Sequence, residues 1–537
     1  MSNLSDATRQ IMWNISAAWL MYLLFVIAMA GFAYGLYQRV MVWKAGKADG
    51  ERLGDFGKRC WLMVRELVLQ TRVRNMGYPA VFHSAIFYSF IVFVVTTTIV
   101  ALDYDLGTSF FKGWVYVVLT VGCEIAGLLA LLGIGLALYR RLTRKGEEIP
   151  HELMDMLALG LIFLLILTGF LIEGQRMASV GDPWAALSFV GAGFAQLFGG
   201  IGSGGGEGLH KVLWWTHTVL AMFWIASIPY TKFAHLLFLP TNAFFQRFKP
   251  MGQLARENVL EMMEAEDFDE ETFQLGKQKT TDFTWKQLLD LDACIKCGRC
   301  EMLCPAAQAG EPFGPRRFIN QCQDLHQASL KSQADAVVAA EEKEAAAPAP
   351  VAAKDIVGEA FNEEFLWYCR TCGACMEVCP AYIDHVDSMI EVKRNEIMMQ
   401  GRAPSEGQRF LRTMENMGNP FGAQADRTDW TKDELGARIV PAGGEVDVLY
   451  FVGCLTTFDA QKQRIAKDLV KVLQRAGVDV GVLGSGEKCC GDPARVLGQE
   501  YQFQTSAMEQ IEQLNSRKFN VLLTACPHCF NVLRNEY

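Results

Sequence analysis

Five long apolar segments in the first half of the chain limit its possible folds more than any other feature. They cover about residues 17–37, 80–102, 113–138, 153–172 and 212–238. Each is long enough to cross the hydrocarbon core of a bilayer, about 30 Å thick, as an α-helix. Because lipid offers no partners for backbone polar groups, such segments fold as helices. We therefore expect a mainly α protein with a five-helix transmembrane bundle over residues 1–240.

The basic residues between these segments predict how the helices are oriented. Residues 39–74 hold nine Lys or Arg and residues 140–145 hold four, whereas the alternate loops hold almost none. The positive-inside rule then places the N-terminus outside and the C-terminal half in the cytoplasm. A sixth apolar stretch, residues 184–201, is rich in glycine. We expect it to be interfacial or re-entrant, because a sixth span would reverse this orientation.

Two groups of cysteines in the second half have the spacing of iron–sulfur ligands. Both runs read C-x2-C-x2-C-x3-C-P and end at Pro305 and Pro380. In this pattern the fourth cysteine of each run binds the other run's [4Fe-4S] cluster. The expected ligand sets are Cys294, Cys297, Cys300 and Cys379 for one cluster, and Cys369, Cys372, Cys375 and Cys304 for the other. The alternative is structural zinc, which more often shows two separated CxxC pairs.

A third group of cysteines has a different spacing. It consists of Cys454, Cys489, Cys490, Cys526 and Cys529. Two adjacent sulfurs cannot easily face one cubane, which indicates either an unusual cluster geometry or one thiolate reserved for chemistry. Residues 446–452, 478–483 and 520–524 have the pattern of buried strands, and residues 460–476 that of a helix. We expect an α/β domain whose strand ends bring the thiolates together; the alternative is a domain with incidental buried cysteines.

Histidines within the apolar segments predict a haem site. Ionisable residues inside a membrane are candidates for function. His83 lies near the cytoplasmic start of the second segment and His235 near the cytoplasmic end of the fifth, so both share one depth. Two facing imidazoles at one level are what a bis-histidine haem b needs. The alternative is a pair of buried, hydrogen-bonded histidines without metal.

Four further residues are weighed as parts of this membrane site. His217 precedes His235 by 18 residues, so on one helix it would lie near the opposite side of the membrane, where packing or a quinone contact is expected. His151 and His217 are reserve candidates for a haem ligand, and His210 is expected at the surface. Glu124, midway along the third segment, is expected either to relay protons to a quinone or to be a neutral structural carboxyl.

Composition divides the remaining chain into connectors and domains. We expect a cytoplasmic, helical connector over residues 241–283, a dicluster domain over 284–400, a connector over 401–442 and the α/β domain over 443–537. Residues 327–354 are low-complexity Ala, Glu and Pro, so we expect a disordered insert there. The net charge of −9 gives no indication of nucleic acid binding.

The third cysteine group, with its Cys489-Cys490-Gly491 sequence, resembles the cysteine-rich (CCG) domain of heterodisulfide reductase subunits, which bind noncubane iron–sulfur clusters in paired domains. That pairing implies a second CCG domain, so the pair is expected to be incomplete or completed by another chain. The membrane half resembles the gamma subunit of respiratory nitrate reductase. Two-haem members of that family carry a second histidine ten residues after the first, and Phe93 stands there, which implies one haem.

Over nearly all 537 residues, the combined modules resemble bacterial membrane iron–sulfur proteins associated with electron-transfer flavoproteins. The resemblance implies an inner-membrane enzyme that passes electrons from a soluble flavoprotein to quinone. No Gly-rich dinucleotide motif follows a predicted strand, so hydride chemistry is expected in the partner. Alternatives are a thiol–disulfide:quinone oxidoreductase and a non-catalytic electron-wiring subunit. A homo-oligomer, or a second CCG-bearing chain, is a further possible partner.

Overall fold

The computed structural model describes residues 4–143, 152–199, 203–271, 273–341, 353–422, 424, 426–432 and 436–537. It divides into two compact units. The first comprises Met1–Ala45, Leu53–Phe245 and Ile295–Gly298, and the second comprises Gly46–Arg52, Gln246–Cys294 and Arg299–Tyr537.

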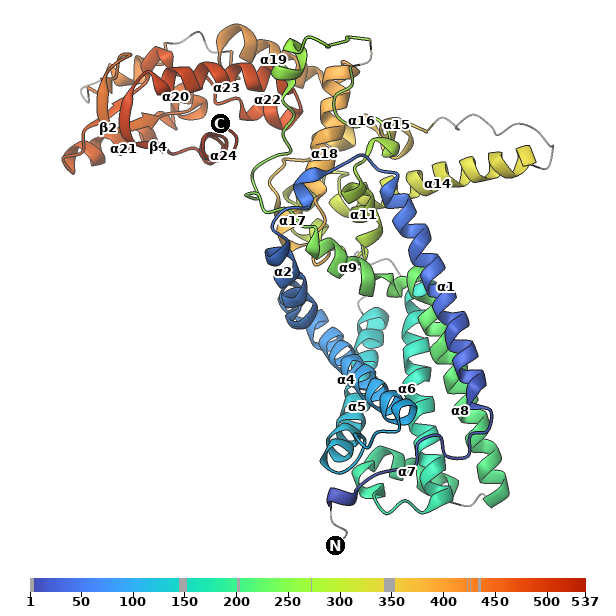
Figure 1. Ribbon diagram of the computed structural model, residues 1–537. Helices are drawn as coiled ribbons and strands as arrows, with labels where there is room; N and C mark the ends of the chain where they lie inside the picture. The colour runs from blue at the N-terminus through green and yellow to red at the C-terminus, as the bar shows by residue number, and fades with distance from the viewer. Residues whose placement is uncertain are drawn as a thin grey trace. The chain divides into compact units, whose positions relative to one another are not determined.

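The first unit is built on long helices, seen in Figure 1 in blue to green. They are α1 (Ala18–Lys44), α4 (Tyr78–Leu106), α5 (Trp114–Thr143), α6 (Leu153–Val180) and α8 (Ser203–Ser227). Among the described residues, five helices are long and apolar enough to cross a membrane, which confirms the expected bundle. Helix α8 packs against both α1 and α6, and α4 packs against α5.

Small residues on α5 allow neighbouring helices to approach closely. A Cβ atom at Gly133 would lie 2.9 Å from the Phe82 carbonyl oxygen on α4, and one at Gly127 would overlap the Phe170 ring on α6. Without a hydrophobic driving force between helices in lipid, such close backbone packing stabilises a bundle. Helix α5 therefore provides the small-residue surface on which both α4 and α6 pack.

The fifth span ends earlier than the sequence predicts. Helix α8 stops at Ser227, two 3-10 turns cover Ile228–Tyr230 and Lys232–Ala234, and helix α9 (His235–Phe244) then begins. Pro229 lies in the first of these turns, where its missing N–H cannot continue a helix. His217 and His235 are therefore on separate helices. The expectation of one continuous helix between them was wrong.

The apolar stretch after α6 forms a short helix and not a sixth span. Helix α7 (Phe189–Phe198) follows a 3-10 turn over Ala185–Leu187. Its ten residues extend about 15 Å, half of what a bilayer needs. A Cβ at Gly174 of α6 would lie 2.6 Å from Phe194 of α7, so the two helices are in tight contact.

Between α1 and α4 the chain forms the amphipathic helix α2 (Phe56–Leu69) and the short α3 (Thr71–Arg74). Trp61 on α2 is exposed, whereas Arg59 is buried and donates to the Phe244 carbonyl at 3.0 Å. This helix has the character expected of one that lies along a membrane surface. Helix α2 also packs against α9.

The part of the chain that carries the two cysteine runs is helical, and its helices range from 4 to 27 residues in length. They are α10 (Val259–Glu264), α11 (Trp285–Ala293), α12 (Arg299–Met302), α13 (Pro305–Gln308), α14 (Pro315–Glu341), α15 (Ile356–Glu359), α16 (Glu363–Trp367), α17 (Ala374–Val378), α18 (His385–Arg394) and α19 (Ser405–Met417). A π-helical turn, Asn395–Met399, continues α18, and 3-10 turns cover Leu4–Asp6, Gly50–Arg52, Thr280–Asp282 and Asp429–Thr431.

Two expectations for this region were wrong. The connector over 241–283 is not a long helix, because after α9 only α10 and a 3-10 turn are regular among its described residues. The proposed disordered insert is helical through Glu341, because α14 continues into its Ala- and Gln-rich part. Such residues are good helix formers. Residues 342–352 lie outside the described residues.

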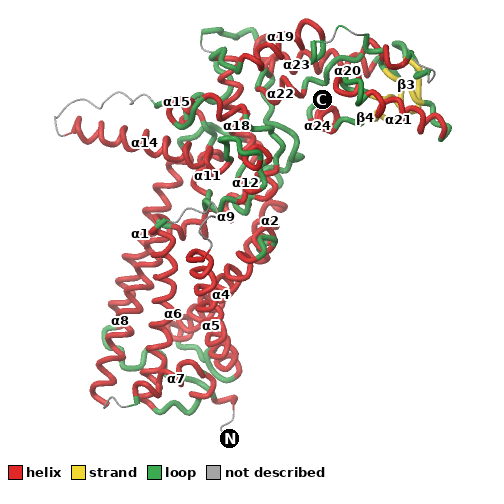
Figure 2. Tube along the Cα trace, turned by 180° about the vertical axis from the view of Figure 1, so that it is seen from behind, coloured by secondary structure: helices red, strands yellow, loops and turns green. Residues whose placement is uncertain are grey.

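The C-terminal part has an α/β fold with a four-stranded parallel sheet, drawn in yellow in Figure 2. Its strands are β1 (Arg438–Ile439), β2 (Glu445–Phe451), β3 (Val480–Val482) and β4 (Lys518–Thr524), in the order β1-β3-β2-β4. The helices are α20 (Cys454–Phe458), α21 (Gln463–Arg475), α22 (Asp492–Leu497), α23 (Glu500–Asn515) and α24 (Pro527–Asn535), with a 3-10 turn over Gly484–Gly486. The predicted strands and the α/β fold are confirmed.

A buried junction joins α18 to α22 and α23 within the second unit. Arg394 pairs with Glu391 at 2.8 Å and with Glu500 at 2.9 Å, and Arg495 also pairs with Glu500. Gly498, between α22 and α23, has a φ of +96° and lies directly against α18. A Cβ there would lie 2.8 Å from the Arg394 nitrogen, so only glycine fits both the backbone and the space.

We expect Gly498→Ala to destabilise the chain more than Gly477→Ala does. Gly477 also has a positive φ of +76°, but nothing lies within 4 Å of a Cβ placed there. Gly477→Ala should cost about 1–2 kcal/mol of backbone strain. Gly498→Ala should add about 1–3 kcal/mol of overpacking. The measurement is the thermal unfolding midpoint of the purified full chain. Equal midpoints for the two variants would contradict the tight junction.

Candidate functional site

The two cysteine runs have matching backbone conformations. Lys296 and Thr371, each just before the second cysteine of its run, have φ values of +55° and +51°. Gly298 and Gly373, each just after that cysteine, have φ values of +76° and +75°. Positive φ is uncommon for Lys and Thr and concentrates at functional sites. Each run therefore folds into the same compact loop, followed by a short helix, α12 or α17.

The fourth cysteine of each run also has a matching conformation. Cys304 has φ and ψ of −75° and 119°, and Cys379 has −70° and 116°. A proline follows each of them, and an extended backbone is what the residue before proline prefers. Helices α12 and α17 contact each other.

Cys304 lies beside the second run and not only beside its own. It lines a small cavity together with Cys369, Cys372 and Cys375. These are the four residues that the sequence groups as ligands of one cluster. Burial raises the pKa values of Cys369 and Cys375. A bound metal would have to displace their protons, as metals do from coordinating thiols.

The five cysteines of the third group lie at the carboxyl ends of parallel strands. Cys454 begins α20 just after β2, Cys489 and Cys490 follow β3, and Cys526 and Cys529 follow β4. Because β2 lies between β3 and β4, these loops meet at one edge of the sheet. In open parallel sheets, ligands bind at this edge where the strand order reverses.

The five thiols lie close enough to influence one another's ionisation. The neighbouring Cys489 and Cys529 thiols lower the pKa of Cys490 to about 6, and the Cys529 thiol lowers the pKa of Cys526 to about 6. A Cβ at Gly453 would lie 3.1 Å from the Cys529 sulfur, so glycine is needed for the loop to pass the thiols.

A buried ion pair supports this thiol cluster. Arg427 donates to the Cys454 sulfur at 3.0 Å and pairs with Glu487 at 3.0 Å. Glu487 in turn accepts from the backbone nitrogens of Val452 and Gly453, each at 2.8 Å. The carboxylate thereby holds the loop after β2, and the guanidinium places a positive charge beside the thiols.

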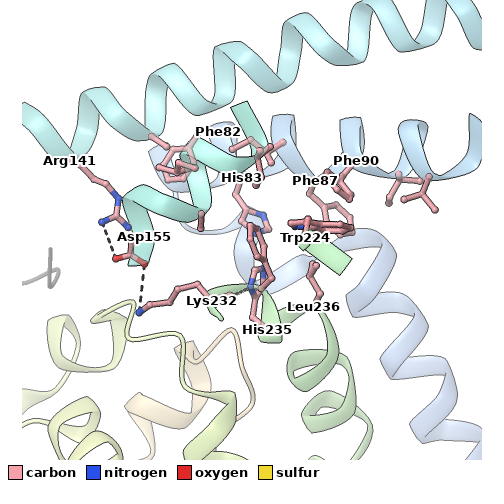
Figure 3. A pocket seen from close by; sticks show the side chains of 18 of the residues that line it. Phe82, His83, Phe87, Phe90, Arg141, Asp155, Trp224, Lys232, His235 and Leu236 are labelled. Carbon is pink, nitrogen blue, oxygen red and sulfur yellow. Dashed lines mark hydrogen bonds and ion pairs between the residues drawn. The ribbon is translucent and has the colours of Figure 1, made fainter. Parts of the chain in front are cut away.

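Two imidazoles face a single cavity of about 460 Å³ in the first unit. His83 on α4 and His235 at the start of α9 point toward one another there, with Trp224 beside them (Figure 3). The remaining wall is largely apolar and includes Phe82, Phe87, Phe90, Ile162 and Leu236. Pockets of this volume, with an apolar lining and a few polar groups, are typical of cofactor sites.

The ring nitrogens of the two histidines suit metal binding. His235 Nδ1 lies 2.6 Å from the Lys232 carbonyl oxygen, which leaves Nε2 for another partner. Metal-bound histidines usually have such a bond on the other nitrogen. His83 Nδ1 is buried and has no hydrogen-bond partner among the described residues. The donor atoms therefore fit a bis-histidine haem.

Basic residues surround one end of the cavity. Arg140 and Arg141 of α5 and Lys232 line it together with Asp155 of α6. Asp155 pairs with Arg141 at 3.1 Å and with Lys232 at 3.7 Å, as the dashed lines in Figure 3 show. Lys232 also pairs with Glu152 at 2.5 Å. Arginine and lysine side chains at this end of the cavity suit the propionates that a haem carries.

The other candidate residues of the membrane half lie apart from this cavity. His217 Nδ1 is 2.8 Å from the Thr168 hydroxyl on α6. Glu124 is buried, and its Oε2 accepts from the backbone nitrogens of Val190 at 2.5 Å and Gly191 at 3.4 Å, at the start of α7. His210 is buried against Trp13, so its expected surface position was wrong. His151 lies outside the described residues.

Sequence reasoning missed the charged partners of both sites. The sequence analysis used Arg140 and Arg141 only to predict the orientation of the helices. It did not identify Arg427 or Glu487. Arg427 is 27 residues from the cysteine it contacts, and nothing in a single sequence indicates that contact. Among the described residues, no three His, Cys, Asp or Glu side chains are arranged to hold a single metal ion. The iron–sulfur assignment therefore depends on the motifs and on the family matches.

Two family models match the chain. Residues 290–383 match the 4Fe-4S dicluster domain, and residues 448–534 match the cysteine-rich CCG domain. The matches cover the cysteines of all three groups. The chain therefore binds iron–sulfur clusters, in agreement with the motifs.

Curated relatives match the chain over different lengths. EtfAB:quinone oxidoreductase of Syntrophomonas wolfei is 32% identical, with 98% of this chain and 75% of the relative covered. A probable iron-sulfur-binding oxidoreductase of Bacillus subtilis, FadF, is also 32% identical, with 85% and 68% covered. One subunit of the dihydromethanophenazine:CoB–CoM heterodisulfide reductase of Methanosarcina barkeri is 28% identical, with 48% and 60% covered.

No solved structure matches the chain significantly. The similarity to the Syntrophomonas wolfei protein covers 98% of the chain and so includes the membrane helices, the dicluster domain and the CCG domain. The chain is therefore a multi-pass membrane protein and an oxidoreductase, and it belongs to the family of membrane-anchored iron–sulfur oxidoreductases that includes EtfAB:quinone oxidoreductase and FadF.

Proposed function

We propose that this protein passes electrons from a soluble electron-transfer flavoprotein to membrane quinone. One observation carries the proposal: a cavity with two facing histidines lies among apolar helices of a chain that also carries three cysteine groups. The relative named EtfAB:quinone oxidoreductase has the same modules over nearly the whole chain. Iron–sulfur clusters and haem, when bound, carry single electrons, which is what a path between a flavin and a quinone requires.

The cysteines are proposed as ligands in the sets that the spacing predicts. Cys294, Cys297, Cys300 and Cys379 would hold one [4Fe-4S] cluster, and Cys369, Cys372, Cys375 and Cys304 the other. The position of Cys304 beside the second run supports the crosswise arrangement. Cys454, Cys489, Cys490, Cys526 and Cys529 would hold the CCG cluster, where Arg427 offsets negative charge.

His83 and His235 are proposed as the residues that would hold one haem b. Arg140, Arg141 and Lys232 would bind its propionates, and the apolar wall would exclude water from the ring. The Lys232 carbonyl orients His235 through Nδ1. Since Phe93 stands where a second haem ligand would be needed, one haem is expected.

Quinone reduction also needs protons, for which Glu124 and His217 are the proposed candidates. Both backbone bonds to the Glu124 carboxylate come from the start of α7, and this favours a structural part for Glu124. His217 uses Nδ1 toward Thr168, so its Nε2 remains the better candidate for contact with a quinone. The basic residues at 39–74 and 140–145 favour a cytoplasmic position for the cysteine domains.

A second candidate function is thiol–disulfide chemistry at the CCG site. The neighbouring Cys489 thiol lowers the pKa of Cys490, which makes Cys490 a potential nucleophile. The similarity to a heterodisulfide reductase subunit supports the same function. An electron-wiring subunit of a larger complex is the third candidate.

Quinone reduction by a reduced flavoprotein tests the proposal directly. The purified full chain should reduce a soluble quinone when it is given reduced electron-transfer flavoprotein, and Cys372→Ser should lower the rate at least about tenfold because a cluster ligand is lost. Cys60→Ser, at a cysteine outside the three groups, should leave the rate unchanged. Thiol release from a disulfide without quinone reduction would favour the second function. Activity only after other subunits are added would favour the third.

Haem content tests the membrane site separately. His83→Ala and His235→Ala should each lose most of the haem b. Removing only the hydrogen-bond partner of a metal ligand lowers metal affinity about 10- to 100-fold, and removing the ligand itself should lower it more. His217→Ala should retain it. The measurement is the pyridine haemochrome spectrum per protein. Two haems per chain, or full haem content in His83→Ala, would contradict the assignment.

A further inference from the structure

A buried lysine lies between the dicluster domain and the CCG domain. Lys393, near the end of α18, is 1% exposed. Its Nζ donates to the Cys369 carbonyl oxygen at 2.9 Å and to the Val496 carbonyl oxygen on α22 at 3.1 Å. Helix α22 begins just after Cys490 and Gly491. One side chain thus contacts both the loop of a proposed cluster ligand and the helix that follows the paired cysteines.

The partners of Lys393 differ from those of the other buried cations around it. Arg394 and Arg495 pair with the carboxylate of Glu500, and Lys286 pairs with Asp290 at 2.7 Å. Lys393 forms no ion pair with any carboxylate in the described part of the chain; its hydrogen bonds go to carbonyl oxygens. A buried charge without a counter-ion is strongly destabilising.

The negative charge that would balance Lys393 lies in the cysteine run. Burial lowers the pKa of Lys393, and an ionised Cys369 beside it opposes that shift. Four thiolates around a cubane make the site more negative, and reduction adds one further electron. A fixed cation beside the site therefore stabilises the reduced form more than the oxidised form.

We propose that Lys393 is a positioning residue that raises the reduction potential of the cluster held by Cys369, Cys372, Cys375 and Cys304, and that fixes this cluster's loop against the CCG domain. The proposal rests on the cluster assignment made above. It concerns the energy of one electron added to that cluster and needs no further reactant.

Redox titration of the full-length protein, followed by EPR, tests this proposal. Lys393→Met keeps the length of the side chain and removes its charge. We expect the reduction equilibrium of one cubane to shift toward the oxidised form by about tenfold, which is 59 mV for a one-electron couple. The second cubane should be unchanged. Lys393→Arg, which retains a cation, should stay closer to the wild type.

Lys488→Met is the matched control, because Lys488 is exposed, pairs with Glu509 at 2.5 Å and is adjacent to Cys489. Its cubane potentials should equal those of the wild type. Unshifted potentials in Lys393→Met with full cluster content would overturn the proposal, as would an equal shift in Lys488→Met.

The cluster content of the two variants distinguishes an electrostatic role of Lys393 from a steric one. If Lys393→Met lost the cluster while Lys393→Arg retained it, with iron and sulfide measured in both, the electrostatic role would be supported. Loss from both variants would indicate a purely steric role and overturn it. Absence of cubane signals from the wild type is a different result, since it would remove the proposed function itself.

Discussion

Metal-bound thiolates place several negative charges inside a protein, and much of the second unit is arranged to accommodate them. Burial opposes the ionised form of Cys369 and Cys375, so their deprotonation depends on what they bind. Cations lie at the edges of these groups: Arg427 beside Cys454 and Lys393 beside Cys369. Lys296 and Thr371 have positive φ values at equivalent positions, so both cysteine runs make the same tight turn before their second cysteine.

In the membrane half the proposed metal ligands are imidazoles, which are neutral, so they need no cation beside them. The cavity wall around them is largely apolar. The charged residues that line the cavity include Arg140, Arg141 and Lys232. Pro229 interrupts the last span, and the turns after it carry both Lys232 and His235 into the cavity wall. In a continuous α-helix the Lys232 carbonyl would instead accept from the backbone N–H of Leu236, four residues on.

Local patterns made a large part of this architecture predictable. Apolar length indicated the spans, alternation indicated the strands of the CCG domain, and cysteine spacing indicated the metal chemistry. The prediction was wrong at the end of α8, where a single proline ends the helix, and along α14, where good helix formers extend the helix into a low-complexity segment. Contacts such as Lys393 with Cys369 and Val496 join residues 24 and 103 positions apart, and no single-sequence pattern encodes them.

The central claim is that one chain connects thiolate-bound clusters to a haem within the bilayer. Quantification of iron, acid-labile sulfide, zinc and haem in the anaerobically purified full chain tests it most directly. The account predicts two cubane clusters, a further CCG cluster and one haem b per chain. Zinc without sulfide, or iron–sulfur clusters with no haem, would contradict it.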